Sequence, residues 1–202
     1  MATRSSIPRL AVKSAALKTR PTVERRGPAR KLVLAPGPEP VPLPVLRIGL
    51  GFDIHPLTAG RRMMIGGVEI PFEKGPAGHS DGDPLLHALT DALLGAAGLG
   101  DMGAHFPDTD PRWKGVSSEI FLRETAKGIA ANNYEILNLD CNIILERPKL
   151  SPHIEAIRRH IASILDLSPE QVSVKAKRHE GLDSLGRNEA VSAQAVVLLV
   201  RR

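Results

Sequence analysis

The sequence predicts an α/β sandwich, in which helices cover one face of a mainly antiparallel, four-stranded sheet. Two observations predict this fold class. Segments with the composition of β-strands are interspersed with segments that repeat apolar residues at helical spacing. The last strand segment is also denser in apolar residues than the others, which is typical of a strand at the centre of a sheet.

Four strands are expected, at residues 46–54, 134–145, 172–176 and 191–200. The third strand alternates clearly, since Val172, Val174 and Ala176 are separated by polar residues. Residues 61–70, in which Gly66-Gly67 lies between two short apolar stretches, predict a hairpin.

Three helices are expected, at residues 83–99, 117–132 and 151–165. The first repeats leucine at helical spacing. Ser80 or Asp81 is expected to cap it, and the free N–H groups of its first turn would favour an anion. Ser151 is expected to cap the third helix, with Pro152 in its first turn.

The basic charge of the chain is concentrated at its N-terminus. The chain carries a formal charge of +5, but residues 1–46 hold nine Lys or Arg and two Glu, so the remaining residues carry −2. The segment before Glu24 is rich in basic residues, Ser, Thr and Ala, as in organellar transit peptides. Proline-rich residues 36–44 predict an extended linker. We expect a transit peptide and linker at 1–46 and the folded domain at 47–202; a disordered basic tail that binds anionic surfaces is the alternative.

The composition argues against several classes of protein. A single cysteine, Cys141, rules out an intrachain disulfide and a cysteine-rich metal site. The body is not basic and the chain holds only six aromatic residues, so nucleic-acid binding is not expected. No run of about 18 apolar residues is present, so no membrane span is expected.

The spacing of Asp53, His55 and His87 predicts a metal site. Residues two apart on a strand point to the same face, so Asp53 and His55 can bind one ion together. His87, 32 positions later on the first predicted helix, would be the third ligand. Two imidazoles and one carboxylate suit Zn²⁺ and leave one coordination position open, as in catalytic sites. The alternative for His87 is a hydrogen-bonded core residue; Asp91 is either a partner of the site or a solvated helix charge.

Polar segments on either side of the first helix are candidates for binding an anionic substrate. His79 and Ser80 can both donate hydrogen bonds to phosphate. The acids of residues 101–111 can accept hydrogen bonds from sugar hydroxyls, although Asp, Gly and Pro are also common turn residues.

Two later segments carry cations. Residues 146–153 present Lys149 in a proline-framed loop, and residues 175–180 end a strand with three further cations at Lys175, Lys177 and Arg178. That segment ends at Glu180, a candidate ligand for Mg²⁺, because this hard ion prefers carboxylate oxygen and is often shared with phosphates.

Five motifs occur together and in order: Gly-Phe-Asp-Ile-His at 51–55, His-Ser-Asp-Gly-Asp at 79–83 with Leu-Leu-His at 85–87, Phe-Pro-Asp-Thr-Asp-Pro at 106–111, Arg-Pro-Lys at 147–149 and Lys-Ala-Lys-Arg-His-Glu at 175–180. In this combination they resemble the 2-C-methyl-D-erythritol 2,4-cyclodiphosphate synthases of the non-mevalonate isoprenoid pathway. The similarity covers residues 47–202. The last motifs resemble the plastid branch, which implies the stroma of a chloroplast or other plastid.

The resemblance implies a homotrimer around a sheet-lined central cavity, with active sites between subunits. It implies Zn²⁺ on Asp53, His55 and His87, and Mg²⁺ or Mn²⁺ on Glu180. The residues that it implies in substrate binding are Asp53, His55, His79, Ser80, Asp101, Gly103, Phe106, Asp108, Asp110, Lys149, Lys177 and Arg187. Those that it implies in catalysis are His79, Arg178 and Glu180.

The implied reaction is an intramolecular phosphoryl transfer. The 2-phosphate of 4-diphosphocytidyl-2-C-methyl-D-erythritol 2-phosphate attacks the β-phosphorus, CMP leaves, and a cyclic diphosphate forms. Positioning and charge neutralisation suffice for such a step, which agrees with a sequence that holds no convincing Ser-His-Asp or Cys-His arrangement. The alternatives are a metal-dependent phosphohydrolase and a catalytically impaired scaffold.

Two residues depart from the pattern of the family. Leu50 replaces a His that, with the residues matched by Arg187 and Glu189, surrounds one end of a central cavity able to hold isoprenoid diphosphates. Arg178 replaces a Thr at a position credited with stabilising the transition state. Because Arg is larger and charged, it is expected either to strengthen phosphate binding or to block the pocket.

Overall fold

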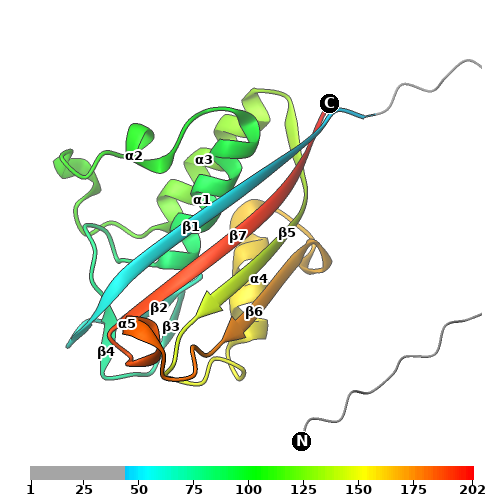
Figure 1. Ribbon diagram of the computed structural model, residues 1–202. Helices are drawn as coiled ribbons and strands as arrows, with labels where there is room; N and C mark the ends of the chain where they lie inside the picture. Colours follow the sequence, from blue (N-terminus) through cyan, green and yellow to red (C-terminus); the bar gives the residue numbers. More distant parts are fainter. Residues whose placement is uncertain (1–43) are drawn as a thin grey trace, which may run out of the picture. The chain divides into compact units, whose positions relative to one another are not determined.

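The computed structural model describes residues 44–202 (Figure 1). The predicted transit peptide and most of the predicted linker lie outside the described residues. The strands are β1 (Leu46–Ala59), β2 (Met63–Ile65), β3 (Val68–Ile70), β4 (Lys74–Pro76), β5 (Tyr134–Ile144), β6 (Val172–Lys177) and β7 (Ala190–Arg201). The helices are α1 (Pro84–Ala97), α2 (Met102–His105), α3 (Glu119–Ala131), α4 (Ile154–Leu165) and α5 (Asp183–Gly186), with 3₁₀ turns η1 (Pro111–Trp113) and η2 (Pro169–Gln171).

The main sheet has the strand order β4-β1-β7-β5-β6. The central position of β7 confirms the prediction from its apolar density. All neighbouring pairs are antiparallel except β5 and β6, which run parallel. The prediction of four strands is wrong, because β4 is a fifth strand that pairs with Leu57–Ala59. Strand β1 is also longer than predicted, since it ends at Ala59 and not at Ile54. Strand β4 has only three residues, one of them a proline, so the sequence shows no strand period there.

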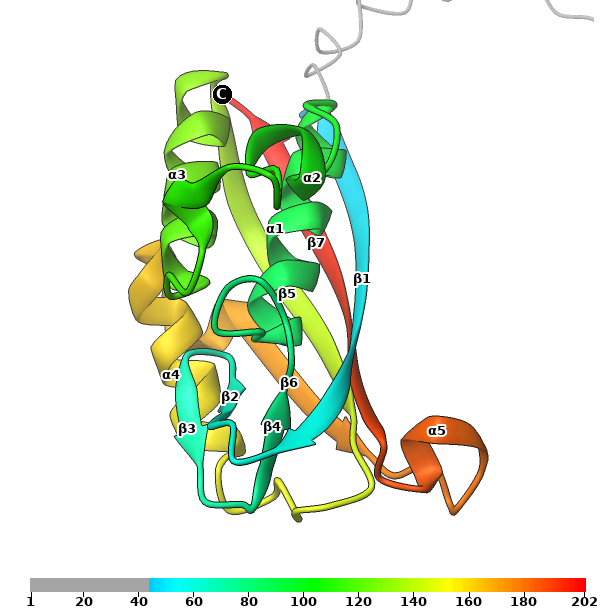
Figure 2. The ribbon, with the colours of Figure 1, turned by 90° about the vertical axis from the view of Figure 1, so that its left-hand side faces the viewer.

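Helices α1, α3 and α4 lie together on one face of the main sheet (Figure 2), as predicted. Alternate residues of β7, among them Val191, Ala193 and Val197, are buried against them. The opposite face of β1 is covered by no element of the described chain, so Ile48 and Leu50 remain 73% and 72% exposed. Alternate side chains of β1 therefore point toward the helices, and those between them form an open apolar surface.

Helix α1 begins at Pro84, and its cap is Asp83 rather than the predicted Ser80 or Asp81. The Asp83 carboxylate accepts hydrogen bonds from the N–H groups of Leu85 and Leu86, at 3.0 and 3.1 Å. These donors were expected to be free for an anion, so that expectation is also wrong. The proline in the first helical position was the signal for the true cap.

Helix α4 begins later than predicted, at Ile154, with His153 rather than Ser151 at its N-cap. The β2–β3 hairpin is confirmed, and both residues of its turn, Gly66 and Gly67, have positive φ (60° and 76°), as a two-residue type I′ turn requires. Gly67 donates its N–H to Asp83 at 2.6 Å, which ties the hairpin to α1. Among residues 44–202, no helix combines the length and apolar character needed to cross a membrane.

Candidate metal centre and substrate pocket

The structure brings Asp53, His55 and His87 together, as the spacing predicted. The Asp53 Oδ2 atom lies 2.8 Å from His55 Nε2 and 2.8 Å from His87 Nδ1. The two ring nitrogens are 3.1 Å apart. One ligand atom from each residue therefore lies within 4.8 Å of the others, the arrangement of a site that can hold one metal ion.

Two glycines on β1 let α1 approach closely enough for His87 to reach the strand. A Cβ atom on Gly49 would lie 1.9 Å from the carbonyl oxygen of Ala92, and one on Gly51 would lie 1.9 Å from that of Ala88. Any side chain at either position would push the helix away. Gly49, Gly51, Asp53 and His55 share the helix-facing side of β1, and the sequence analysis missed this continuation of the period of two.

Hydrogen bonds behind the cluster fix how both imidazoles present their lone pairs. His55 donates its Nδ1–H to the Ala77 carbonyl at 2.8 Å, so its Nε2 lone pair faces Asp53. On His87, the Nε2 atom lies 2.9 Å from the Ser118 hydroxyl. Since that hydroxyl donates its own proton to Asp81, it accepts the Nε2–H of His87. The Nδ1 lone pair of His87 then points into the cluster.

This arrangement fits a metal ion such as Zn²⁺. Two imidazole lone pairs and one carboxylate oxygen converge, and each imidazole is oriented by a hydrogen bond through its other nitrogen, as metal-binding histidines usually are. Burial favours a raised pKa for Asp53, but the adjacent His55 and His87 imidazoles outweigh it and hold the pKa of the carboxyl well below its usual range. Asp53 is therefore an anion with histidine nitrogens as neighbours.

Ser118 was not predicted as a site residue. It comes from the start of α3, 31 positions after His87, and its side chain is fully buried. Its place in the cluster depends on how α3 packs against α1, and no spacing rule in the sequence encodes that distance.

His79 and Ser80 lie in the loop before α1 and face different surroundings. His79 is exposed and lines a cavity of about 520 Å³ together with Arg61 and Lys114. Ser80 is buried, and its hydroxyl lies 3.0 Å from His87 Nε2. The Ser80 hydroxyl thus faces the histidine, and its predicted contact with substrate stays a prediction.

Asp91 shares a face of α1 with His87, but its hydrogen bond goes elsewhere. Its carboxylate accepts the Met102 N–H at 2.6 Å and so anchors α2 to α1. Burial, with a smaller contribution from the neighbouring Asp101 carboxylate, raises the pKa of Asp91. Asp91 therefore positions the following loop.

The predicted sugar-binding residues lie in that loop, where several have structural partners. Asp101 accepts the Ala104 N–H at 2.9 Å and caps α2, beside the exposed Gly103. Asp110 caps η1 and pairs with Arg112, while Asp108 is exposed. The turn chemistry that we considered as the alternative is therefore present, and it does not test sugar binding.

Phe106 joins an aromatic cluster that reaches the metal ligands. Its ring centroid lies 4.9 Å from that of Phe121 and 5.4 Å from that of Trp113. Phe121 in turn lies 6.1 Å from the His87 ring. This cluster packs the 101–113 loop against the side of the metal centre.

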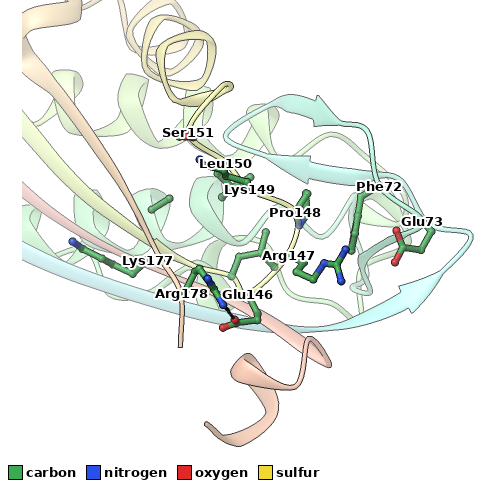
Figure 3. A pocket seen from close by; sticks show the side chains of 12 residues that line it. Phe72, Glu73, Glu146, Arg147, Pro148, Lys149, Leu150, Ser151, Lys177 and Arg178 are labelled. Atoms are coloured by element: carbon green, nitrogen blue, oxygen red, sulfur yellow. Dashed lines mark hydrogen bonds and ion pairs between the residues drawn. The ribbon is translucent and has the colours of Figure 1, made fainter. Parts of the chain in front are cut away.

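Three of the predicted cations line a second cavity, of about 900 Å³ (Figure 3), whereas Lys175 lies outside it and pairs with Asp140. Lys149 enters its wall from the loop after β5, and Lys177 and Arg178 from the end of β6. Arg178 pairs with Glu146, which was not predicted as a site residue. The two segments are neighbours because β5 and β6 are parallel, so their C-terminal ends lie side by side.

Glu180 and Arg187 come later in the sequence than Arg178, the last residue that lines this cavity. Glu180 is exposed, with φ of 51°, and within residues 44–202 it lies outside the Asp53 cluster. Arg187 forms an exposed ion pair with Glu189 at 3.0 Å. Neither placement tests their predicted roles.

The comparisons with known proteins decide the family. The model of the YgbB family matches residues 46–200, which contain both the metal cluster and the cation-lined cavity. The chain belongs to the YgbB family. Its similarity to a 2-C-methyl-D-erythritol 2,4-cyclodiphosphate synthase of Burkholderia mallei is 56% identity over 155 residues, 77% of this chain and 96% of the relative.

Solved structures agree with this family assignment. One titled as a 2C-methyl-D-erythritol-2,4-cyclodiphosphate synthase is 46% identical, with a TM-score of 0.71 over 76% of this chain and 99% of that one. The IspF protein of Plasmodium falciparum, solved as a CDP complex, is 36% identical, with a TM-score of 0.69 over 78% of this chain and 97% of that one. The fold described above is therefore the fold of these synthases.

Proposed function

We propose that this member of the YgbB family is a phosphorus–oxygen lyase that converts 4-diphosphocytidyl-2-C-methyl-D-erythritol 2-phosphate to 2-C-methyl-D-erythritol 2,4-cyclodiphosphate and CMP. The observation that carries the proposal is the convergence of the Asp53, His55 and His87 lone pairs on one point. The relative at 56% identity is named for this product.

The reaction needs positioned charge more than a protein nucleophile. An oxygen of the 2-phosphate forms a bond to the β-phosphorus, and the bond from that phosphorus to the CMP oxygen breaks, so CMP leaves with the electron pair. Asp53, His55 and His87 would hold Zn²⁺, Glu180 would hold Mg²⁺ or Mn²⁺, and these ions would neutralise charge on the phosphate oxygens.

The chain's own residues would bind and orient the two ends of the substrate. Lys177 and Arg178 line a cavity wide enough for a nucleotide and would pair with the diphosphate. His79 is exposed in the cavity that Arg61 and Lys114 also line, and it would donate to the 2-phosphate. Holding the attacking oxygen near the β-phosphorus turns the step into an oriented intramolecular reaction.

We also propose a homotrimer, with the metal centre of one subunit facing the cation-lined cavity of the next. The support is the open face of β1, where apolar side chains are exposed in a row: Leu46, Ile48, Leu50, Phe52 and Ile54. A contiguous apolar face of this kind usually marks an interface. Three copies would enclose an apolar cavity, and an isoprenoid diphosphate is the ligand that its apolar wall would suit, with Arg187 as the proposed partner of the diphosphate.

For residues 1–46 we propose import into a plastid, on the strength of their basic, Ser- and Ala-containing composition. The matched family region begins at residue 46, at the first residue of β1. Fusion of these residues to a fluorescent protein in plant cells would test the proposal, and cytosolic fluorescence would contradict it.

The decisive experiment for the reaction is phosphorus NMR of the purified protein with the diphosphocytidyl substrate, Zn²⁺ and Mg²⁺. We expect CMP and a cyclic diphosphate to appear together. Inorganic phosphate or an open-chain product would identify a phosphohydrolase instead. Unchanged substrate would identify a scaffold whose catalysis is impaired.

A further inference from the structure

The Glu146 carboxylate lies where the two walls of the cation-lined cavity meet (Figure 3). Glu146 follows β5, directly after Leu145, whose N–H still donates to the Lys177 carbonyl at 3.0 Å. The parallel pairing of β5 and β6 thus continues up to Glu146 and delivers it to the end of β6.

Glu146 holds the segment after β6 through both of its oxygens. Its Oε1 atom accepts hydrogen bonds from Arg178 Nε at 3.0 Å and from Arg178 Nη2 at 2.5 Å. Its Oε2 atom accepts the backbone N–H of His179 at 3.0 Å. One carboxylate therefore fixes both a side chain and the backbone of the turn that carries Glu180, which itself has a positive φ.

The two partners of the ion pair differ in exposure, and this difference indicates their roles. The Glu146 side chain is only 11% exposed, whereas that of Arg178 is 64% exposed. A guanidinium carries five N–H donors, and Glu146 takes those along the Nε–Nη2 edge, so the N–H groups of Nη1 stay available to a ligand. Donation from Arg178 lowers the pKa of Glu146, which keeps the carboxylate charged.

We propose that Glu146 is a positioning residue: it holds Arg178 at the edge of the cavity as an additional cation for the substrate diphosphate, and it fixes the turn that presents Glu180. The inference rests on the proposed function, since it takes this cavity as the cytidine diphosphate pocket. On this view Arg178 strengthens phosphate binding because Glu146 keeps it beside the cavity and out of its centre.

Calorimetric titration of CDP with Mg²⁺ tests the positioning of Arg178. Glu146→Ala should weaken CDP binding by about 10-fold, the usual scale for losing an oriented, charged hydrogen-bond partner. Arg178→Thr should weaken it by a similar factor. The double variant should lose less CDP affinity than the product of the two single-variant losses predicts, because Glu146 acts in part through Arg178.

Glu135→Ala is the matched control, since Glu135 holds Arg202 in an exposed ion pair and does not line this cavity. Removing this acid should leave CDP affinity unchanged. Tighter binding by Glu146→Ala would overturn the proposal, because Glu146 would then compete with phosphate for Arg178. Strictly multiplicative losses would overturn it too, because the two residues would act independently.

Amide hydrogen exchange tests the backbone role without any ligand. In Glu146→Ala, peptides covering residues 178–182 should exchange about 10-fold faster or more, because the His179 N–H loses its acceptor. Glu146→Gln, which keeps an acceptor oxygen, should exchange like the parent while still binding CDP more weakly. Unchanged exchange in Glu146→Ala would refute the positioning role, whereas absence of CDP binding by the parent protein would refute the proposed function instead.

Discussion

Along β1, alternate residues face two different environments. The side that packs on α1 carries Gly49, Gly51, Asp53 and His55, and every one of them is needed for the metal cluster, either as a ligand or as space for the helix. The other side carries Ile48, Leu50, Phe52 and Ile54, all exposed. Alternation along one strand therefore separates the candidate metal ligands from the apolar row of the proposed interface, and substitutions one position apart should have unrelated effects.

The largest effect is expected from Gly51→Ala. The added methyl would meet the Ala88 carbonyl oxygen at 1.9 Å, so α1 must move or the fold must open. We expect a loss of about 3 kcal/mol or more in the free energy of unfolding, measured by urea denaturation, together with loss of bound zinc. Gly95→Ala is the control, because a Cβ there meets nothing within 4 Å, and it should stabilise the helix by up to about 1 kcal/mol. Equal stability of Gly51→Ala and the parent would contradict the close-packing argument.

His87→Ala should abolish stoichiometric zinc binding, because it removes one of three ligands from the cluster. Elemental analysis measures the zinc, and circular dichroism checks that the fold survives. Ser118→Ala sharpens the test, since it leaves all three ligands and removes one of the two hydroxyls, those of Ser118 and Ser80, that lie beside His87 Nε2. We expect a zinc affinity about 10- to 100-fold weaker. Full zinc retention by His87→Ala would disprove the site.

On the open side, Phe52→Glu should change assembly while sparing the metal. Phe52 is 53% exposed in the isolated subunit and would lie in the proposed interface, where a carboxylate would be buried without a partner. Light scattering should report a monomer in place of a trimer, with zinc still bound. Ile120→Glu is the control, because Ile120 is similarly exposed, at 41%, but lies on α3. A Phe52→Glu protein of trimeric mass would place the interface elsewhere.

The smallest effect is expected from Leu50→His, which leaves the strand and the cluster untouched. Each copy would add one hydrogen-bond donor to the wall of the proposed cavity, so geranyl diphosphate should bind about 10-fold more tightly in calorimetric titration. Leu46→His, on the same face but further along the strand, should leave the affinity unchanged. Equal affinity of Leu50→His and the parent would mean that the cavity does not bind the diphosphate at this end.

The metal ligands were predictable because their geometry is local. Asp53 and His55 follow the two-residue period of a strand, and His87 lies on a helix that the leucine spacing reveals. The roles of Gly49 and Gly51 follow the same period and could have been predicted with them. The cap of α1 could also have been found, because Pro84 marks Asp83 as the residue before the helix.

Other parts of the site depend on distances that the sequence does not encode. Ser118 reaches His87 only because α3 packs against α1, and Glu146 reaches Arg178 only because β5 and β6 lie side by side. Short β4 has no period of its own and is defined by its pairing with β1. Local patterns thus predict ligands, whereas the residues that orient those ligands come from tertiary packing.

The pairing of β1 with β7 runs without interruption from Leu46 to Pro56. A slip of one residue in that pairing would exchange the two sides of β1, bringing the metal ligands to the open surface and Leu50 beneath the helix. Gly49 and Gly51 prevent this, because the contact with α1 has no room for a leucine or isoleucine side chain. The glycines thus restrict β1 to one alignment with β7, and a one-residue insertion or deletion within β1 would disrupt both the candidate metal ligands and the exposed apolar row.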